Sequence, residues 1–143
     1  MQPTIKATRT RASYPDVPIF GQNFDEFMYF LHEPNNGAAV LSPERFTALM
    51  NMDIKELATQ AHVHRNTVTR APESENLQRF IREAVRVVRA ASDIVDSIDR
   101  AIFWYRNEPL PVFKYKTAET LVSEGRTEDV LDYVMSLQAG AAG

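Results

Sequence analysis

Apolar residues recur every three or four positions along most of the chain, which is the spacing of a buried helix face. The first such segment, around Phe27, follows two possible helix caps, Asn23 and Asp25. The second begins at residues 42–44, where a serine, a proline and a glutamate stand in the order typical of a helix start. Residues 112–116 alternate with a strand period but are too few for more than an extended linker. The pattern therefore predicts an all-α fold.

Further helices are predicted where a cap residue or a proline precedes an apolar helical pattern. Asp53 and Glu56 have the spacing of a capping box, in which the side chain of each residue binds the backbone of the other. The remaining predicted starts lie at His64, after Pro72, at Ser92 or Asp93, at Thr117 and at Thr127.

These signals divide the chain into three regions. Residues 1–22 lack periodicity and contain prolines at 15 and 18, so they are expected to form a flexible arm. Residues 23–91 form a helical region with a helix-turn-helix pattern. Residues 92–143 form a C-terminal domain, and its last residues, 139–143, are expected to be a mobile tail.

The composition is that of a soluble globular protein, with 44% hydrophobic and 24% charged residues in 143. The absence of cysteine excludes disulfides, thiolate zinc sites and thiol nucleophiles. The sequence shows neither an apolar run of the roughly 20 residues that a membrane helix needs nor an N-terminal secretory signal. We therefore expect a cytoplasmic protein.

Charge is sorted along the chain, although the net value is only −3. Residues 62–91 carry six bases and three acids, and residues 92–143 carry five bases and nine acids. A local basic face attracts nucleic acid even on a weakly acidic protein, whereas ordinary variation between helix surfaces gives similar sorting. The long helix after Pro72 has an apolar stripe on one side and four arginines opposite: Arg79, Arg82, Arg86 and Arg89.

Residues 53–70 have the spacing of a helix-turn-helix. In such a unit a small residue lies where two short helices cross, and apolar residues support the second helix. Ala58 has the place of the small residue, and His62 occupies the turn position that is usually a glycine. The apolar supports are Leu57, Val63 and Val68.

The second helix of this unit is expected to turn six polar residues outward. Arginine suits guanine edges and phosphate, asparagine suits adenine, and threonine suits phosphate or thymine. A structural hairpin in a plain helical bundle has the same spacing, so both interpretations stay open at this point. The predicted DNA-binding residues are His64, Arg65, Asn66, Thr67, Thr69 and Arg70.

Aromatic residues gather at the end of the helix that precedes the proline-containing segment 108–111. Trp104 and Tyr105 stand beside Arg106. Aromatic side chains next to an arginine are typical of protein–protein contacts, and they also close the end of a small core. The residues alone leave both roles open.

Nothing in the sequence predicts catalysis. The three histidines lack the spacing of a metal site, and the chain has no glycine-rich phosphate loop, G-x-S-x-G or H-E-x-x-H motif. Acidic residues 93, 96 and 99 are typical of a solvated helix face rather than of acid–base machinery. We expect a protein that is not an enzyme and that holds no metal or cofactor.

The order of these features resembles the Xre/MbcA/ParS family of type II antitoxins over residues 42–140, about two thirds of the chain. Many members of the family have a glycine-rich turn where this chain has the bulky, basic residues 112–116. The N-terminal part of the resemblance is the 53–70 pattern. The C-terminal part consists of an aromatic helix end at Phe103 and Trp104, an Asn–Pro turn with Leu110, a T-x-x-x-L helix with Thr117 and Leu121, and a final helix with Val130 and Leu131.

The resemblance implies an Xre-like helix-turn-helix followed by a small helical toxin-binding domain. Partners of the family are RES-domain toxins, which consume NAD, and the C-terminal domain is expected to cover the NAD pocket of such a toxin. The helix-turn-helix is expected to bind operator DNA, so that the pair represses its own operon. The residues expected to contact the toxin are Trp104, Tyr105, Lys114, Lys116, Arg126, Tyr133 and Leu137.

A homodimer is also expected, because one helix-turn-helix contacts only one half-site of an operator. An alternative function is a stand-alone helix-turn-helix repressor whose C-terminal half only dimerises. A helical scaffold without DNA binding is the third possibility. The expected dimer contacts are either Phe24, Phe27 and Leu31, or Val85 and Ile98.

Overall fold

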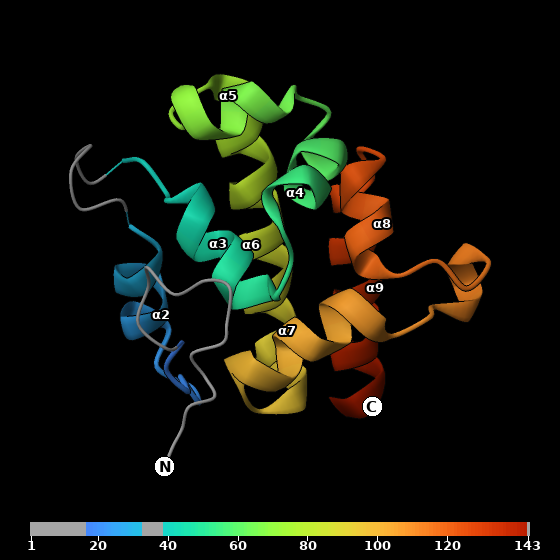
Figure 1. The fold of residues 1–143 in the computed structure, drawn as a ribbon. Helices are drawn as coiled ribbons and strands as arrows, with labels where there is room; N and C mark the ends of the chain where they lie inside the picture. The colour runs from blue at the N-terminus through green and yellow to red at the C-terminus, as the bar shows by residue number, and fades with distance from the viewer. Residues whose placement is uncertain (1–16, 33–38, 143) are drawn as a thin grey trace, which may run out of the picture.

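The computed structural model describes residues 17–32 and 39–142, and these ranges contain helices and no strand, as predicted (Figure 1). None of the described helices combines the length and hydrophobicity needed to cross a membrane. In chain order the helices are α2 (Phe24–Leu31), α3 (Pro43–Met50), α4 (Ile54–Ala61), α5 (Arg65–Arg70), α6 (Glu75–Val95), α7 (Ile98–Asn107), the 3-10 turn η1 (Pro111–Phe113), α8 (Ala118–Ser123) and α9 (Thr127–Ala142).

Four helices begin at the caps that the sequence predicts. Asn23, Ser42, Asp53 and Thr117 each accept a hydrogen bond from the backbone N–H three residues further on, at 2.8–3.1 Å. Each bond satisfies one of the N–H groups that the first turn of a helix leaves without a partner inside the helix.

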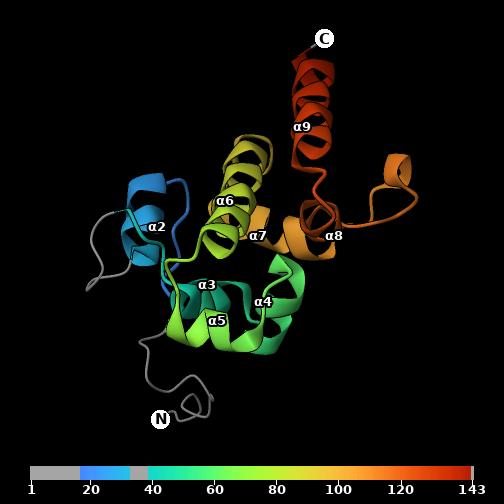
Figure 2. The same ribbon diagram turned by 90° about the horizontal axis from the view of Figure 1, so that it is seen from above.

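The longest helix, α6, lies between α2 and α9 (Figure 2) and also contacts α4, α7 and α8. One hydrophobic core extends around it from α2 to α9. The side chains that α6 buries completely are Leu77, Ile81, Ala84, Val87 and Val88.

The predicted start of a new helix at Ser92 or Asp93 is wrong. Residues 92–95 continue α6, and the chain breaks only at Asp96, whose φ of +68° ends the helix. Ser97 then caps α7 by accepting a hydrogen bond from the backbone N–H of Arg100 at 2.9 Å. The division between the two predicted regions at residue 92 therefore falls inside α6.

Residues 17–22 are not the flexible arm that the sequence predicts. Phe20 is 3% exposed, and its N–H and that of Gly21 donate to the Asp99 carboxylate on α7, at 2.8–3.2 Å. Gly21 has a φ of +58°, which glycine adopts without a side-chain clash. The rest of the predicted arm, residues 1–16, lies outside the described residues.

Two predictions in the C-terminal region are also wrong. Residues 112–116 are not an extended linker, because the segment folds back on itself. The Tyr115 N–H donates to the Leu110 carbonyl at 2.9 Å, and the Leu110 N–H donates to the Lys116 carbonyl at 3.0 Å. Residues 139–140, expected in a mobile tail, continue α9.

The expected dimer contacts are occupied inside one chain. Phe27, Leu31 and Ile98 are at most 1% exposed, and Val85 is 6% exposed. Phe24 is partly buried against the same core. Apart from Phe24, these side chains are already packed in the core of one chain, so a contact between two copies near them would involve neighbouring exposed residues, and where two copies meet stays a prediction.

Arg106, near the end of α7, connects four helices. Its guanidinium donates to the carbonyls of Met50 and Asn51 at the end of α3 and to Glu56 Oε2 on α4, the last at 2.7 Å. Its Nε lies 2.8 Å from Glu119 Oε2 on α8. The Glu119 side chain is only 11% exposed, and burial raises the pKa of its carboxyl while Arg106 opposes that shift.

Replacing Arg106 with methionine is expected to lower the free energy of unfolding by about 3 kcal/mol at neutral pH, because Glu119 then keeps a buried charge without its partner. The pKa of Glu119 in the folded protein rises further above its ordinary value. Below the ordinary pKa of a glutamate, Glu119 is protonated in both the folded and the unfolded state, and the variant loses least stability there. The loss grows as the pH rises through the raised pKa of Glu119 in the folded state, because the carboxyl must then carry its charge while buried. Urea unfolding followed by circular dichroism at several pH values measures both effects.

The double variant Arg106→Met/Glu119→Gln is expected to regain much of the lost stability and to lose the added pH dependence. Arg100→Met, at an exposed position of the same helix, is the matched control. An equal loss for Arg106→Met at acidic and neutral pH would contradict this account.

Candidate nucleic-acid interface

The small and apolar residues that the sequence pattern places inside the hairpin of α4 and α5 are buried or partly buried. Ala58 is 4% exposed where the two helices meet, Leu57 is fully buried, and Val68 is 3% exposed. Val63 is partly buried, and its N–H donates to the Ala58 carbonyl at 3.0 Å. The hairpin lies at one end of the molecule, with α5 outermost (Figure 1).

The turn of the hairpin depends on His62. Its backbone is left-handed, with φ +59° and ψ +41°, which explains why glycine is usual at this position. Its ring Nε2 lies 2.8 Å from the carbonyl oxygen of Ser123, at the end of α8. The Ser123 hydroxyl donates to the Gln60 carbonyl at 2.8 Å. A glycine would ease the backbone but would remove the contact between the turn and α8.

The other end of the hairpin is held by Gln78 on α6, which is 5% exposed. Its amide nitrogen donates to the carbonyls of Leu41 and Pro72, both at 2.8 Å. Its amide oxygen accepts from the Leu41 N–H at 2.9 Å. The chain that enters α3 and the chain that leaves α5 are therefore fastened to one buried side chain.

Five of the six predicted DNA-binding residues are exposed, and Thr67 is half-buried. Asn66 and Arg70 lie opposite the buried Val68 at helical spacing, and Arg65, three residues before Val68, is exposed at the start of α5. The exposed side of α5 carries hydrogen-bond donors and no carboxylate within α5. Its chemistry matches phosphate oxygens and the edges of bases.

His64 differs in one respect from its predicted place. It precedes α5 as the N-cap, and its Nδ1 accepts a hydrogen bond from the Asn66 N–H at 3.0 Å. A histidine cap was not foreseen because serine, threonine, aspartate and asparagine are the usual caps. The ring is exposed beside Arg65 and remains at the same surface.

The four arginines of α6 are exposed as predicted, but each also contacts another group of the chain. Arg86 pairs with Glu128 at 3.1 Å, and the Arg89 guanidinium lies 4.4 Å from the centre of the Phe24 ring. Arg82 donates to the carbonyl of Ala39, and Arg79 donates to the side chain of Asn76. Arg82, Arg86 and Arg89 therefore connect α6 to other parts of the chain, whereas the contact of Arg79 stays within α6.

Tyr105 is wrongly predicted as a toxin contact, because its side chain is completely buried in the core. It follows Ile98 and Ala101 on the inner side of α7, at helical spacing. Burial raises the pKa of its hydroxyl well above the ordinary value, so the group stays neutral. Trp104, beside it, is only partly buried against the core.

The segment around η1 packs on α9 through aromatic and charged contacts. The rings of Phe113 and Tyr133 meet edge to face, with centroids 5.7 Å apart. Arg126 lies 5.2 Å from the centre of the Phe113 ring and pairs with Asp129 at 2.9 Å. Of the other predicted toxin contacts, Lys116 pairs with Glu124 at 2.8 Å, and Lys114 and Leu137 are exposed.

Large apolar side chains are exposed on the same two elements. Val112 and Tyr115 are 68% and 69% exposed, and Met135 and Leu137 are 64% and 38% exposed. We call these four residues together the loop–α9 surface, although Met135 and Leu137, two residues apart, point to different sides of α9. The sequence prediction missed Val112, Tyr115 and Met135 as exposed apolar residues. For Val112 and Tyr115 a signal was present, because apolar residues in a segment without a helical period have no helix face on which to be buried.

Among residues 17–32 and 39–142, no three histidine or acidic side chains are placed to hold a metal ion. Comparison of the chain with protein-family models, with curated proteins and with solved structures gives no match. The two candidate surfaces are therefore the exposed side of α5 and the loop–α9 surface.

Two substitutions of His62 distinguish the free-energy cost of its left-handed backbone from the stabilisation that the ring contact with Ser123 provides. Alanine removes the contact and keeps a side chain in the left-handed conformation, whereas glycine removes the contact and relieves that conformation. We expect the glycine variant to be about 1 kcal/mol more stable than the alanine variant in urea unfolding. Equal stabilities would show that the turn does not impose this backbone conformation in solution.

Proposed function

We propose that the chain is the antitoxin of a type II toxin–antitoxin pair and that it represses its own operon in the cytoplasm. In this proposal α5 binds operator DNA, and the loop–α9 surface together with Trp104 binds a RES-domain toxin that consumes NAD. The observation that carries the proposal is the hairpin of α4 and α5. Its apolar residues are buried or partly buried in the core, and its outer helix α5 exposes polar side chains.

The dimensions and chemistry of α5 support DNA binding. A helix with its side chains is about 10–12 Å across, so α5 can enter a major groove about 12 Å wide. Arg65 and Arg70 stand at the two ends of this short helix, and Asn66 lies between them. One unit of this kind contacts one half-site, so we propose that operator binding involves a homodimer.

The C-terminal region supports a protein partner. Exposed aromatic and aliphatic side chains such as Tyr115 and Met135 are typical of the energetic centre of an interface. Glu128 and Asp129 on the same helix pair with Arg86 and Arg126, whereas Asp132 is exposed there and would attract a basic pocket that binds a phosphate-rich dinucleotide. Electrostatic attraction would speed the encounter, and apolar contact would hold the complex.

Arg65→Ala and Arg70→Ala are each expected to weaken binding to DNA from upstream of the gene, by roughly 5- to 150-fold if a base contact of about 1–3 kcal/mol is lost. The loss of a phosphate contact would instead lower the salt dependence by about one unit. Mobility-shift titrations at several salt concentrations distinguish the two. Arg100→Ala, at an exposed site on α7, is the matched control, and unchanged binding by both α5 variants would refute the assignment.

Replacing Val112 and Tyr115 with aspartate and serine is expected to abolish co-purification with the product of the adjacent reading frame and to leave DNA binding intact. Both side chains are exposed, so the fold should persist, which circular dichroism checks. Deletion of α9 is a poorer test because it removes the buried residues Val130 and Val134.

The control for this surface is Tyr29→Ser, at a position 81% exposed on α2. If the double variant still rescued cells that express the neighbouring protein, the toxin contacts would lie elsewhere. If the wild-type chain bound DNA but no neighbouring protein, the function would be that of a stand-alone repressor.

A further inference from the structure

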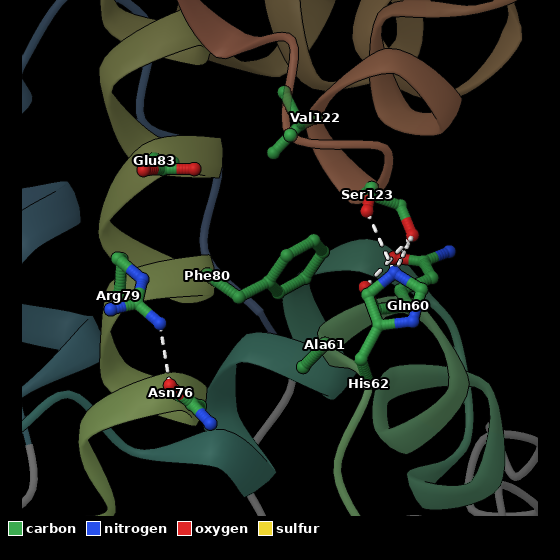
Figure 3. A pocket seen from close by; sticks show the side chains of 10 residues that line it. Gln60, Ala61, His62, Asn76, Arg79, Phe80, Glu83, Val122 and Ser123 are labelled. Carbon is green, nitrogen blue, oxygen red and sulfur yellow. Dashed lines mark hydrogen bonds between the residues drawn. The ribbon is translucent and has the colours of Figure 1, made fainter.

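A pocket of about 260 Å³ lies between the end of α4, the first turns of α6 and the end of α8 (Figure 3). Ala61, Phe80 and Val122 give it apolar walls. The volume is just below the roughly 300–1,000 Å³ of sites for drug-sized ligands, so the pocket suits a smaller molecule. It includes none of the residues of the α5 side or of the loop–α9 surface.

Two opposite charges stand on the α6 wall of this pocket, one helical turn apart. Arg79 is exposed and donates to Asn76 Oδ1, and Glu83 accepts from the Thr127 hydroxyl at 2.9 Å through Oε1. Opposite charges at this spacing commonly pair, but no ion pair joins these two in the part of the chain that the structure describes. Arg79 therefore keeps further N–H donors, and Glu83 keeps its second oxygen.

The wall opposite α6 is polar and carries no carboxylate, lysine or arginine. It consists of Gln60, His62 and Ser123, which are hydrogen-bonded to one another across the α4–α8 contact. The pocket thus offers one cation and one anion close together, beside an aromatic ring and an aliphatic side chain.

We propose that this pocket binds a small zwitterion, a free α-amino acid with an apolar side chain. The carboxylate of the ligand would pair with Arg79, and its ammonium group would pair with Glu83. Its side chain would lie against Phe80 and Val122. This pairing satisfies both charges of the pocket at once, which an anion or an amine alone does not.

The place of the pocket gives such binding a structural consequence. Its walls belong to the turn between α4 and α5, to the central helix and to α8, so a bound ligand lies between all three. Binding to the folded state alone raises the melting temperature as the ligand concentration rises. The proposal does not depend on the function proposed for α5, because DNA plays no part in it.

Thermal unfolding and titration calorimetry of the full chain with L-leucine and L-methionine test the proposal. We expect both amino acids to bind, and N-acetyl-L-leucine and L-leucinamide, which each lack one charge, to bind at least about tenfold more weakly. Arg79→Gln and Glu83→Gln are each expected to weaken L-leucine binding by about 10- to 100-fold, the range for one hydrogen bond to a charged group. Arg86→Gln, on the same helix and outside the pocket, is the matched control.

Arg79 is exposed, and glutamine at position 83 keeps an acceptor for Thr127, so both variants should remain folded, which circular dichroism verifies. Three results would overturn the proposal. They are no binding of either amino acid at millimolar concentration, equal binding of the singly charged analogues, and unchanged binding by both pocket variants.

Discussion

Four helices converge on the guanidinium group of Arg106, and the relation between the two halves of the molecule depends on it. The partly buried guanidinium donates to the carbonyl of Met50 at the end of α3 and to Glu56 on α4, and it forms an ion pair with Glu119 on α8. Any shift of α4 relative to α8 would leave Arg106 or Glu119 with an uncompensated charge. The electrostatic requirement of one side chain thus constrains the position of α4 relative to α8.

Contacts on both sides of α5 explain why this helix can be so short. A six-residue helix has little stability of its own, because helix nucleation is costly and few hydrogen bonds follow it. Here the chain before α5 is fastened to α8 through His62, and the chain after it is fastened to α6 through Gln78. Val68 alone is buried from the helix itself. The other side chains of this segment make local contacts: the Thr69 hydroxyl donates to the Asn66 carbonyl at 3.2 Å, and the His64 ring caps the helix.

Local signals in the sequence predicted local structure well. The caps at Asn23, Ser42, Asp53 and Thr117, and the packing of Ala58 and Leu57 in the hairpin, depend on neighbouring residues and were confirmed. The errors arose where distant contacts decide the outcome. Ser92 resembles a cap but remains helical because α6 continues along the core, and Tyr105 is apolar enough to be buried despite its hydroxyl. The contacts of Arg106 join residues about 50 positions apart, and no spacing rule reveals them.

The continuous course of α6 through residue 92 has a consequence for how the chain folds. A helix that supplies core residues to both halves gives neither half a complete core of its own. The two halves are therefore bound into one cooperative unit, in which native structure is gained or lost as a whole. A surface at the C-terminal end and a surface at the hairpin then share a single folding free energy. A substitution that destabilises the fold at one surface therefore also lowers the fraction of folded molecules, and with it the fraction that presents the other surface.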